Sequence, residues 1–215
     1  MPPVMRLYED SISGGAAAVS LPALARMIFV VHGAVTIDGK ALRDGEAWSG
    51  EGACSLAPGK DGVTLWRFEL AASGSTSHPI KGALRSQEKL AAVLETIPQG
   101  ELLLRGDSVA FPPGGCAYLH RHQGPGIRCL IEGSLRIDSA GRSHTHEIGD
   151  AWFESGPDPV FAQAGNRPTR FIRVMILPSA LIGKSSIQYV NDEDKAKPRT
   201  QQYRVYVDAP LARSS

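Results

Sequence analysis

The sequence predicts an all-β protein built from two similar halves. Three observations support this class: an internal repeat, a series of short apolar segments rich in β-branched and aromatic residues, and frequent turn residues. The 215 residues include 23 glycines and 15 prolines, a composition typical of many short strands joined by tight turns. A chain of this length can form one large domain or two small ones, with a substantial hydrophobic core.

The repeat links residues about one hundred positions apart. Gly33 and Asp38 match Gly133 and Asp138 in similar apolar surroundings, and Gly45-Glu-Ala-Trp is matched by Gly149-Asp-Ala-Trp. A period of this length with matched turns indicates a duplicated domain rather than a solenoid. The resulting boundaries are an N-terminal half (1–75), a linker (76–100), a C-terminal half (101–180) and a C-terminal extension (181–215).

Most elements within these boundaries are expected to be strands, because their residues are β-branched or aromatic and turns follow closely. The exception is Ser86–Ile97, which begins with a serine cap, carries Glu88 in its first turn and is followed by Pro98; this pattern predicts a helix in the linker. The expected strands are 28–31 and 35–37 in the first half, 102–104, 109–111, 129–131, 135–137 and 171–176 in the second, and 202–208 in the extension.

Composition and charge exclude several classes of protein. Hydrophobic residues make up 42% of the chain and charged residues 21%, values typical of a globular domain. The net charge of +1 gives no reason to expect nucleic acid or an anionic membrane as a partner. Three cysteines, an odd number without a close pair, favour a reducing compartment, so we expect a cytoplasmic protein without a signal peptide or membrane span. No phosphate-binding loop, nucleophile elbow or CxxC pair is present.

The segment from Pro112 to His122 contains the most informative motif, His120-Arg-His122. On a strand, alternate side chains share a face, so both imidazoles are expected to point into the barrel, with Tyr118 on the same face. Two imidazoles that share one interior can bind one divalent metal ion.

This segment resembles the first motif of the cupin family, in which a glycine precedes an HxH pair by five residues. Gly114, His120, His122 and Gly133 fall at the family's positions, and Gly149-Asp-Ala-Trp-Phe-Glu-Ser-Gly-Pro resembles the opening of the second motif. The resemblance covers about residues 15–72 and 101–178. It implies duplicated cupin barrels (double-stranded β-helix, or jelly-roll) joined by the helical linker, with Fe, Mn, Ni or Zn as the metal.

The chain departs from the family at two ligand positions. The glutamate ligand should lie at Gly126 or Ile127, and the second-motif histidine should lie near Val160. In the first half, Ser20 and Pro22 stand where the HxH pair is expected, so that half is predicted to lack a metal.

Glu154 is the best candidate for a third metal ligand, because its strand faces the HxH strand in cupins; Gln163 and Gln123 are weaker options. Arg128 shares the strand face of position 126 and is expected to hold an anionic substrate, with Tyr118 and Gln163 as further substrate-binding residues. A purely structural ion pair of Arg128 with Glu132 or Glu154 is the competing interpretation. A pair with Glu154 would leave that carboxylate less free to bind metal.

The sequence alone leaves three functions open. The first is a metal-dependent enzyme of the dioxygenase, isomerase or lyase type that acts on a small, anionic metabolite. The second is a non-catalytic small-molecule binding or sensor module without metal, and the third is a structural relict. The N-terminal arm and the final strand (203–208) lie outside the predicted barrels and are apolar enough to pair with a sheet edge, of this chain or of another subunit, and we expect a homodimer.

Overall fold

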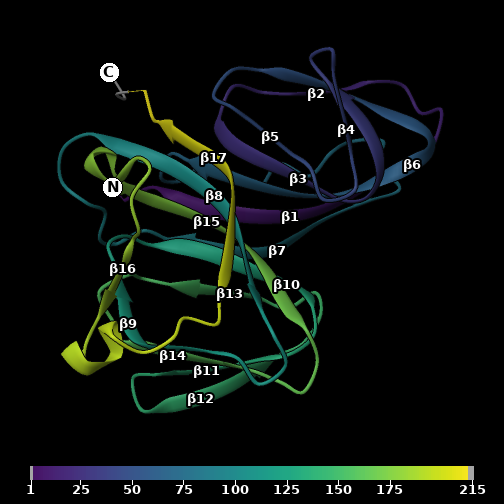
Figure 1. Cartoon of the computed structure of the whole chain (residues 1–215). Helices are drawn as coiled ribbons and strands as arrows, with labels where there is room; N and C mark the ends of the chain where they lie inside the picture. Colours follow the sequence, from purple (N-terminus) through teal and green to yellow (C-terminus); the bar gives the residue numbers. More distant parts are fainter. Residues whose placement is uncertain (1, 213–215) are drawn as a thin grey trace. The chain divides into compact units, whose positions relative to one another are not determined.

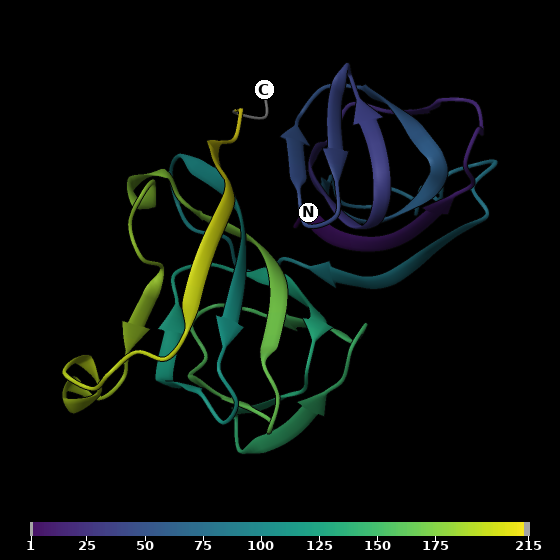
Figure 2. The same cartoon turned by 45° about the vertical axis from the view of Figure 1, so that its right-hand side comes forward.

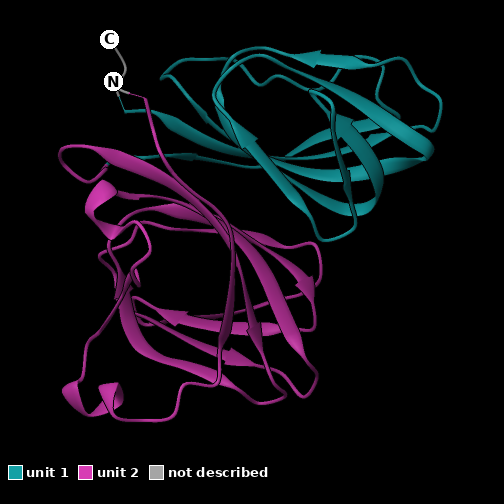
Figure 3. Cartoon of the chain, turned by 45° about the horizontal axis from the view of Figure 1, so that its top comes forward, with its two compact units in different colours: residues 1–95, 214 teal, residues 96–213, 215 magenta. Residues whose placement is uncertain are grey.

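A computed structural model of the chain describes residues 2–212 (Figure 1). It divides into two compact units, one ending at Glu95 and the other beginning at Thr96 (Figure 3). Both units consist of antiparallel strands, and the helical structure of the described residues is confined to two short 3-10 turns, η1 (Ser179–Leu181) and η2 (Asp192–Lys195). The all-β prediction is therefore confirmed at the level of class.

Unit 1 contains one twisted sheet with the strand order β4-β3-β6-β1-β7, in which β2 also pairs with β6 and β5 with β3. Its two longest strands, β3 and β6, run side by side and bend around an apolar core that includes Ile28, Leu56 and Leu65. The strands are β1 (Val4–Ile12), β2 (Val19–Leu21), β3 (Ala25–Ile37), β4 (Lys40–Arg43), β5 (Ala47–Gly50), β6 (Cys54–Ala71) and β7 (Arg85–Val93).

Unit 2 contains two sheets with the strand orders β13-β10-β15-β8-β17 and β12-β11-β14-β9-β16 (Figure 2). Its apolar core, which includes Phe111, Leu130 and Phe171, is drawn from both sheets. The strands are β8 (Leu102–Phe111), β9 (Cys116–His122), β10 (Gly126–Glu132), β11 (Leu135–Ser139), β12 (Arg142–His146), β13 (Ala151–Glu154), β14 (Val160–Ala164), β15 (Thr169–Pro178), β16 (Ile187–Tyr189) and β17 (Gln202–Pro210).

The predicted helix at Ser86–Ile97 is wrong, because this segment forms strand β7. β7 pairs with β1 along most of its length, and the Ser86 side chain bonds to Asp10 instead of capping a helix. The ladder to β1 satisfies the backbone groups that a helix would have satisfied locally, so tertiary pairing overrides the helix propensity of this segment. The structure therefore places Arg85–Val93 in unit 1 and leaves no helical linker.

The final strand and the N-terminal arm both lie in sheets of their own chain. β17 pairs with β8, and β1 lies between β6 and β7. β16 likewise pairs with β9, and residues 181–212 lie in unit 2. Both segments thus pair with strands of their own chain, and a homodimer remains a prediction.

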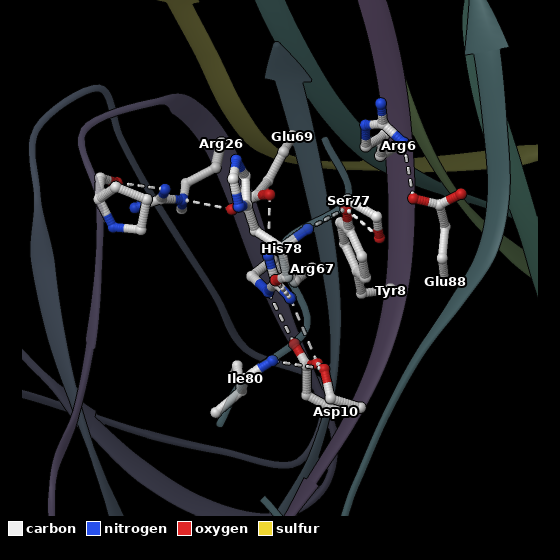
Figure 4. A network of polar contacts seen from close by, with 12 residues as sticks. Arg6, Tyr8, Asp10, Arg26, Arg67, Glu69, Ser77, His78, Ile80 and Glu88 are labelled. Atoms are coloured by element: carbon white, nitrogen blue, oxygen red, sulfur yellow. Dashed lines mark hydrogen bonds and ion pairs between the residues drawn. The ribbon is translucent and has the colours of Figure 1, made fainter. Parts of the chain in front are cut away.

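Unit 1 buries a continuous chain of four charged side chains (Figure 4). Arg26 bonds to Glu69, Glu69 contacts Arg67 at 2.8 Å, and Arg67 bonds to Asp10 at 2.7 Å. Arg67 also donates to the carbonyl oxygen of His78, which fixes the loop that precedes β7. Because the two cations and two anions neutralise one another inside the sheet, this network is a structural element of the unit.

Candidate functional site

Strand β9 brings the two predicted histidines together inside unit 2. Both imidazoles are buried, their Nε2 atoms are 3.2 Å apart, and the intervening Arg121 is exposed. His120 Nδ1 lies 2.7 Å from the carbonyl oxygen of Tyr118, so in the neutral ring Nδ1 carries the proton and Nε2 presents its lone pair to His122. The HxH alternation thus places both rings at one point of the interior.

Glu154 reaches the same point from strand β13. It stands directly opposite Gly126 in the ladder between β13 and β10, and its Oε2 atom lies 3.2 Å from His122 Nε2. Its other oxygen, Oε1, accepts a hydrogen bond of 2.9 Å from Trp152 Nε1. Strand β10 of this chain has no carboxylate at position 126, and the carboxylate near the histidines comes from the neighbouring strand β13.

Arg128 occupies the position between this carboxylate and the β10 backbone. One guanidinium nitrogen donates to the Gly126 carbonyl oxygen at 2.6 Å, and the other lies 2.9 Å from Glu154 Oε2. Its partner is therefore Glu154, whereas Glu132 contacts Arg170 at the surface. The ion pair with Glu154 is the arrangement that competes with metal binding by that residue.

Burial and the ion pairs determine the protonation states at the site. Burial lowers the pKa of His122 to about 3, although Glu154 acts in the opposite direction, and burial also lowers the pKa of His120. Burial lowers the pKa of Arg128 to about 10, so this side chain stays charged at neutral pH. Burial alone would raise the pKa of Glu154, but Arg128 and His122 outweigh it and hold the pKa well below its usual range. The site thus contains two neutral imidazoles beside a charged pair.

A small cavity of about 20 Å³ lies beside these groups. This volume is enough for about one water molecule or one ion, and it is far below the size of an organic ligand site. Its walls are the two histidines, Arg128 and Glu154 together with Val109, Phe111, Ala117, Ile137, Val160, Ala162, Phe171, Arg173, Ile187 and Tyr203.

Two predicted substrate-binding residues do not line this cavity. The pairing of β9 with β14 is irregular between Ala117 and His120, and this bulge breaks the alternation, so Ala117 lines the cavity and Tyr118 does not. Tyr118 contributes its carbonyl oxygen to His120 instead of a side chain to the cavity wall.

Gln163 lies on the face of β14 opposite to Val160 and Ala162, which line the cavity. Its side-chain amide donates to the carbonyl oxygens of Gly114 and Gly115 at 2.6 and 3.2 Å. Its role is therefore to hold the turn before β9.

The sequence interpretation missed a second buried ion pair, between Arg173 on β15 and Asp107 on β8. Two hydrogen bonds of 2.9 and 2.7 Å join the side chains, and Arg173 also lines the cavity. The signal was present in the sequence, since a charged residue within a largely apolar strand is buried only when it is paired. Asp107 and Arg173 each stand in such a strand.

The donor atoms fit a divalent metal ion in part. Two imidazole nitrogens bound to one ion at their usual bond lengths lie about 2.9–3.4 Å apart, which matches the His120–His122 distance. Glu154 Oε2 is a buried oxygen without a hydrogen-bond partner among the described residues. Within residues 2–212, however, no three His, Cys, Asp or Glu side chains are arranged so that they could hold a metal ion. The two histidines are in position, and the carboxylate is engaged by Arg128.

No family model matches the chain, and no curated protein is detectably similar to it in sequence. Also, none of the helices in the described residues is long and apolar enough to cross a membrane.

Several solved structures share the fold. A mutant of Bacillus subtilis oxalate decarboxylase matches 90% of this chain and 73% of its own, with 13% identity and a TM-score of 0.62, and another structure of that enzyme concerns its Mn(II) centres. Salicylate 1,2-dioxygenase from Pseudaminobacter salicylatoxidans matches 94% of this chain and 75% of its own, with 12% identity and a TM-score of 0.55. A cupin 2 conserved barrel domain protein from Leptotrichia buccalis matches 81% of this chain and 84% of its own, with 11% identity and a TM-score of 0.50. At these identities the similarity concerns the fold alone, and that fold is the cupin β-barrel.

Proposed function

We propose that the chain is a duplicated cupin in which unit 2 carries the functional centre. Matching strand pairings support the duplication: β1 lies between β6 and β7 as β8 lies between β15 and β17. In unit 1, β3 pairs with β4, β5 and β6, and in unit 2 β10 and β11 together pair with β12, β13, β14 and β15.

Individual ladder positions support the same proposal. Ile28 stands opposite Trp48 and Arg67, and Arg128 stands opposite Trp152 and Arg173. An aliphatic residue in unit 1 thus corresponds to the arginine of the candidate site. Since the buried histidines of the described residues (His120, His122 and His146) also lie in unit 2, the functional centre is assigned to that unit.

We propose that this centre binds a divalent metal ion through Nε2 of His120 and His122 and acts on a small anionic molecule. The single observation that carries the proposal is the convergence of two buried, neutral imidazole nitrogens at 3.2 Å. A bound Fe, Mn, Ni or Zn ion would act as a Lewis acid toward an oxygen of the substrate, which suits a dioxygenase, an isomerase or a lyase.

Arg128 and Glu154 have linked roles in this proposal. In the arrangement described, the guanidinium neutralises the carboxylate at 2.9 Å. An anionic group of a substrate would compete with Glu154 for Arg128, because a guanidinium binds carboxylates through paired N–H donors. That exchange would release Glu154 Oε2, so anion binding is expected to strengthen metal binding. By thermodynamic linkage, metal binding would strengthen anion binding to the same extent.

A metal-free binding or sensor module is the second candidate. The observation that favours it is that the polar side chains of the site already contact one another. With Nδ1 of His120 protonated, the His122 Nε2 proton points toward two acceptors, His120 Nε2 and Glu154 Oε2. Four interior charges, Arg128 with Glu154 and Arg173 with Asp107, already cancel, so a divalent cation would add uncompensated charge.

Metal analysis of the whole protein, purified without chelator, distinguishes the two candidates. We expect about one metal equivalent per chain, lost in His120→Ala and in His122→Ala. His144→Ala is the matched control, because His144 belongs to the exposed part of a second HxH pair on β12 and should leave the metal content unchanged.

The metal proposal is rejected if chelator-treated protein binds neither Mn²⁺ nor Zn²⁺ in calorimetry while circular dichroism shows that it is folded. Retention of the metal in both histidine variants would equally reject the assignment to this site. Either result leaves the metal-free module as the function that the geometry supports.

A further inference from the structure

Unit 2 contains a second, larger pocket of about 550 Å³, built entirely from residues after Gly183. We call it the tail pocket; its walls include Ile187, Tyr189, Lys195, Arg199, Gln201 and Tyr203. The volume is within the range of about 300–1,000 Å³ that small-molecule sites occupy. It is therefore large enough for a metabolite, unlike the cavity beside the histidines.

The tail pocket adjoins the candidate site. Strand β16 pairs with the histidine strand β9, with Ile187 opposite His122 and Tyr189 opposite His120 (Figure 1). Ile187 and Tyr203 line both the tail pocket and the inner cavity. These two side chains are therefore common to the walls of both spaces.

The chemistry of its walls favours an anion. No aspartate or glutamate lines the tail pocket, whereas Lys195 and Arg199 do. Lys195 is paired with Asp192. The Arg199 guanidinium lies 5.7 Å from the centroid of the Tyr189 ring and has no carboxylate partner among the described residues. A guanidinium on a tyrosine face keeps its N–H donors available for a carboxylate.

The remaining walls favour a flat ligand body. Tyr189 and Tyr203 supply two aromatic rings, and Gln188 and Gln201 supply amide donors and acceptors. Aromatic faces stack with planar groups, and amides bond to hydroxyl and carbonyl oxygens. A tetrahedral inorganic anion would use the guanidinium but not the rings.

We propose that the tail pocket binds a planar organic carboxylate, with its carboxylate on Arg199 and its body against Tyr189 and Tyr203. The inference names the ligand class for the unit 2 centre and in that respect rests on the proposed function. Binding in the tail pocket itself requires neither a metal nor the histidines.

Benzoate is the probe for the test, with benzamide as its neutral isostere and inorganic phosphate as a non-planar anion. Binding to the full chain is measured by ligand-observed NMR titration. We expect benzoate to bind at least tenfold more tightly than benzamide or phosphate, and Arg199→Gln to weaken benzoate binding at least tenfold.

Arg204→Gln is the matched control. Arg204 lies on β17, is also exposed, and packs on a tyrosine in the same way, 5.0 Å from the centroid of the Tyr206 ring, but does not line the tail pocket. This variant should bind benzoate as the unchanged protein does. Circular dichroism of both variants verifies folding, and Tyr189→Leu, which should also weaken benzoate binding, tests the ring independently of the charge.

Several results would overturn the inference: no benzoate binding, equal binding of phosphate and benzoate, or equal effects of Arg199→Gln and Arg204→Gln. His120→Ala separates the two proposals. Benzoate binding that persists in this variant, with the expected effect of Arg199→Gln, supports the tail pocket whatever the metal analysis shows.

Discussion

Glu154→Gln is the most direct test of the buried pair at the candidate site. The substitution preserves the shape of the side chain and an acceptor for Trp152, but it removes the negative charge 2.9 Å from Arg128. The Arg128 side chain is 1% exposed, so water cannot replace the lost carboxylate. Apart from Glu154, the acceptor that the structure gives it is the Gly126 carbonyl oxygen.

The expected loss in the free energy of unfolding follows from leaving the Arg128 guanidinium without its counter-ion. Removal of one partner of a buried ion pair costs about 3–5 kcal/mol. We expect the lower end, about 3 kcal/mol, because Arg128 still donates a hydrogen bond to the Gly126 carbonyl oxygen. With a urea m-value of about 1–3 kcal/mol/M, the midpoint of unfolding should fall by about 1–3 M.

The assay is urea denaturation of chelator-treated full-length protein, followed by hydrogen exchange at peptides that cover β10 and β13, so that unit 2 is observed by itself. Glu132→Gln is the matched control, since Glu132 contacts Arg170 at 3.7 Å near the surface and should cost at most about 1 kcal/mol. Replacing Arg128 by Met as well as Glu154 by Gln should recover part of the loss, because no unpaired charge is then left buried at this position. A loss for Glu154→Gln no larger than that of the control would refute the reasoning.

Three further substitutions or conditions test the fold and the protonation states. In Gly126→Ala the new Cβ would lie 2.3 Å from the carbonyl oxygen of Val174, so we expect a loss of about 1–3 kcal/mol in thermal unfolding; an unchanged melting temperature would contradict this close approach. Asp10→Asn removes one of the two carboxylates of the buried chain and leaves its two arginines with Glu69 alone, which should destabilise unit 1 by about 3–5 kcal/mol and leave hydrogen exchange in unit 2 unchanged. His122 has a folded pKa of about 3 against an ordinary value of 6.5, so the unfolded state binds the proton first and stability falls as the pH drops through this window. Between pH 7 and pH 5 the loss for this residue is about 2 kcal/mol by urea denaturation, and the same loss in His122→Gln would exclude His122 as its source.

The sequence was informative about the strands because most of them bury a β-branched or aromatic face. The expected segments 28–31, 35–37, 109–111 and 171–176 all lie within strands of the structure. The segment Ser86–Ile97 was misread because its cap, its acidic first turn and its following proline satisfy every local rule for a helix start and stop. Local rules carry no information about β1, whose free edge receives this segment as β7. The helix prediction therefore failed because the pairing of this segment with β1 cannot be read from the segment itself.

The same distinction explains the candidate site. The alternation of His120 and His122 is a local property of one strand, and it placed both rings correctly in one interior. The orientation of Tyr118 depends on the pairing of β9 with β14, where a bulge shifts the register. A bulge of this kind has no distinctive signature in the sequence of β9, so strict alternation was the only available assumption.

The relation of Gly126 to Glu154 shows how a carboxylate can reach the interior beside the histidines from a neighbouring strand. Compared position by position with the cupin motif, the chain lacks its glutamate, because Gly126 carries no side chain. In the β10–β13 ladder, however, Gly126 and Glu154 are directly opposite, and opposite side chains on one face of an antiparallel pair lie about 5 Å apart. A carboxylate side chain at position 126 would also force the neighbouring strand to shift, since even a Cβ would meet the Val174 carbonyl oxygen and the Met175 side chain. The glycine on β10 and the glutamate on β13 are therefore two parts of one arrangement, in which the acidic group approaches the histidines from the adjacent strand and is available to Arg128 as well.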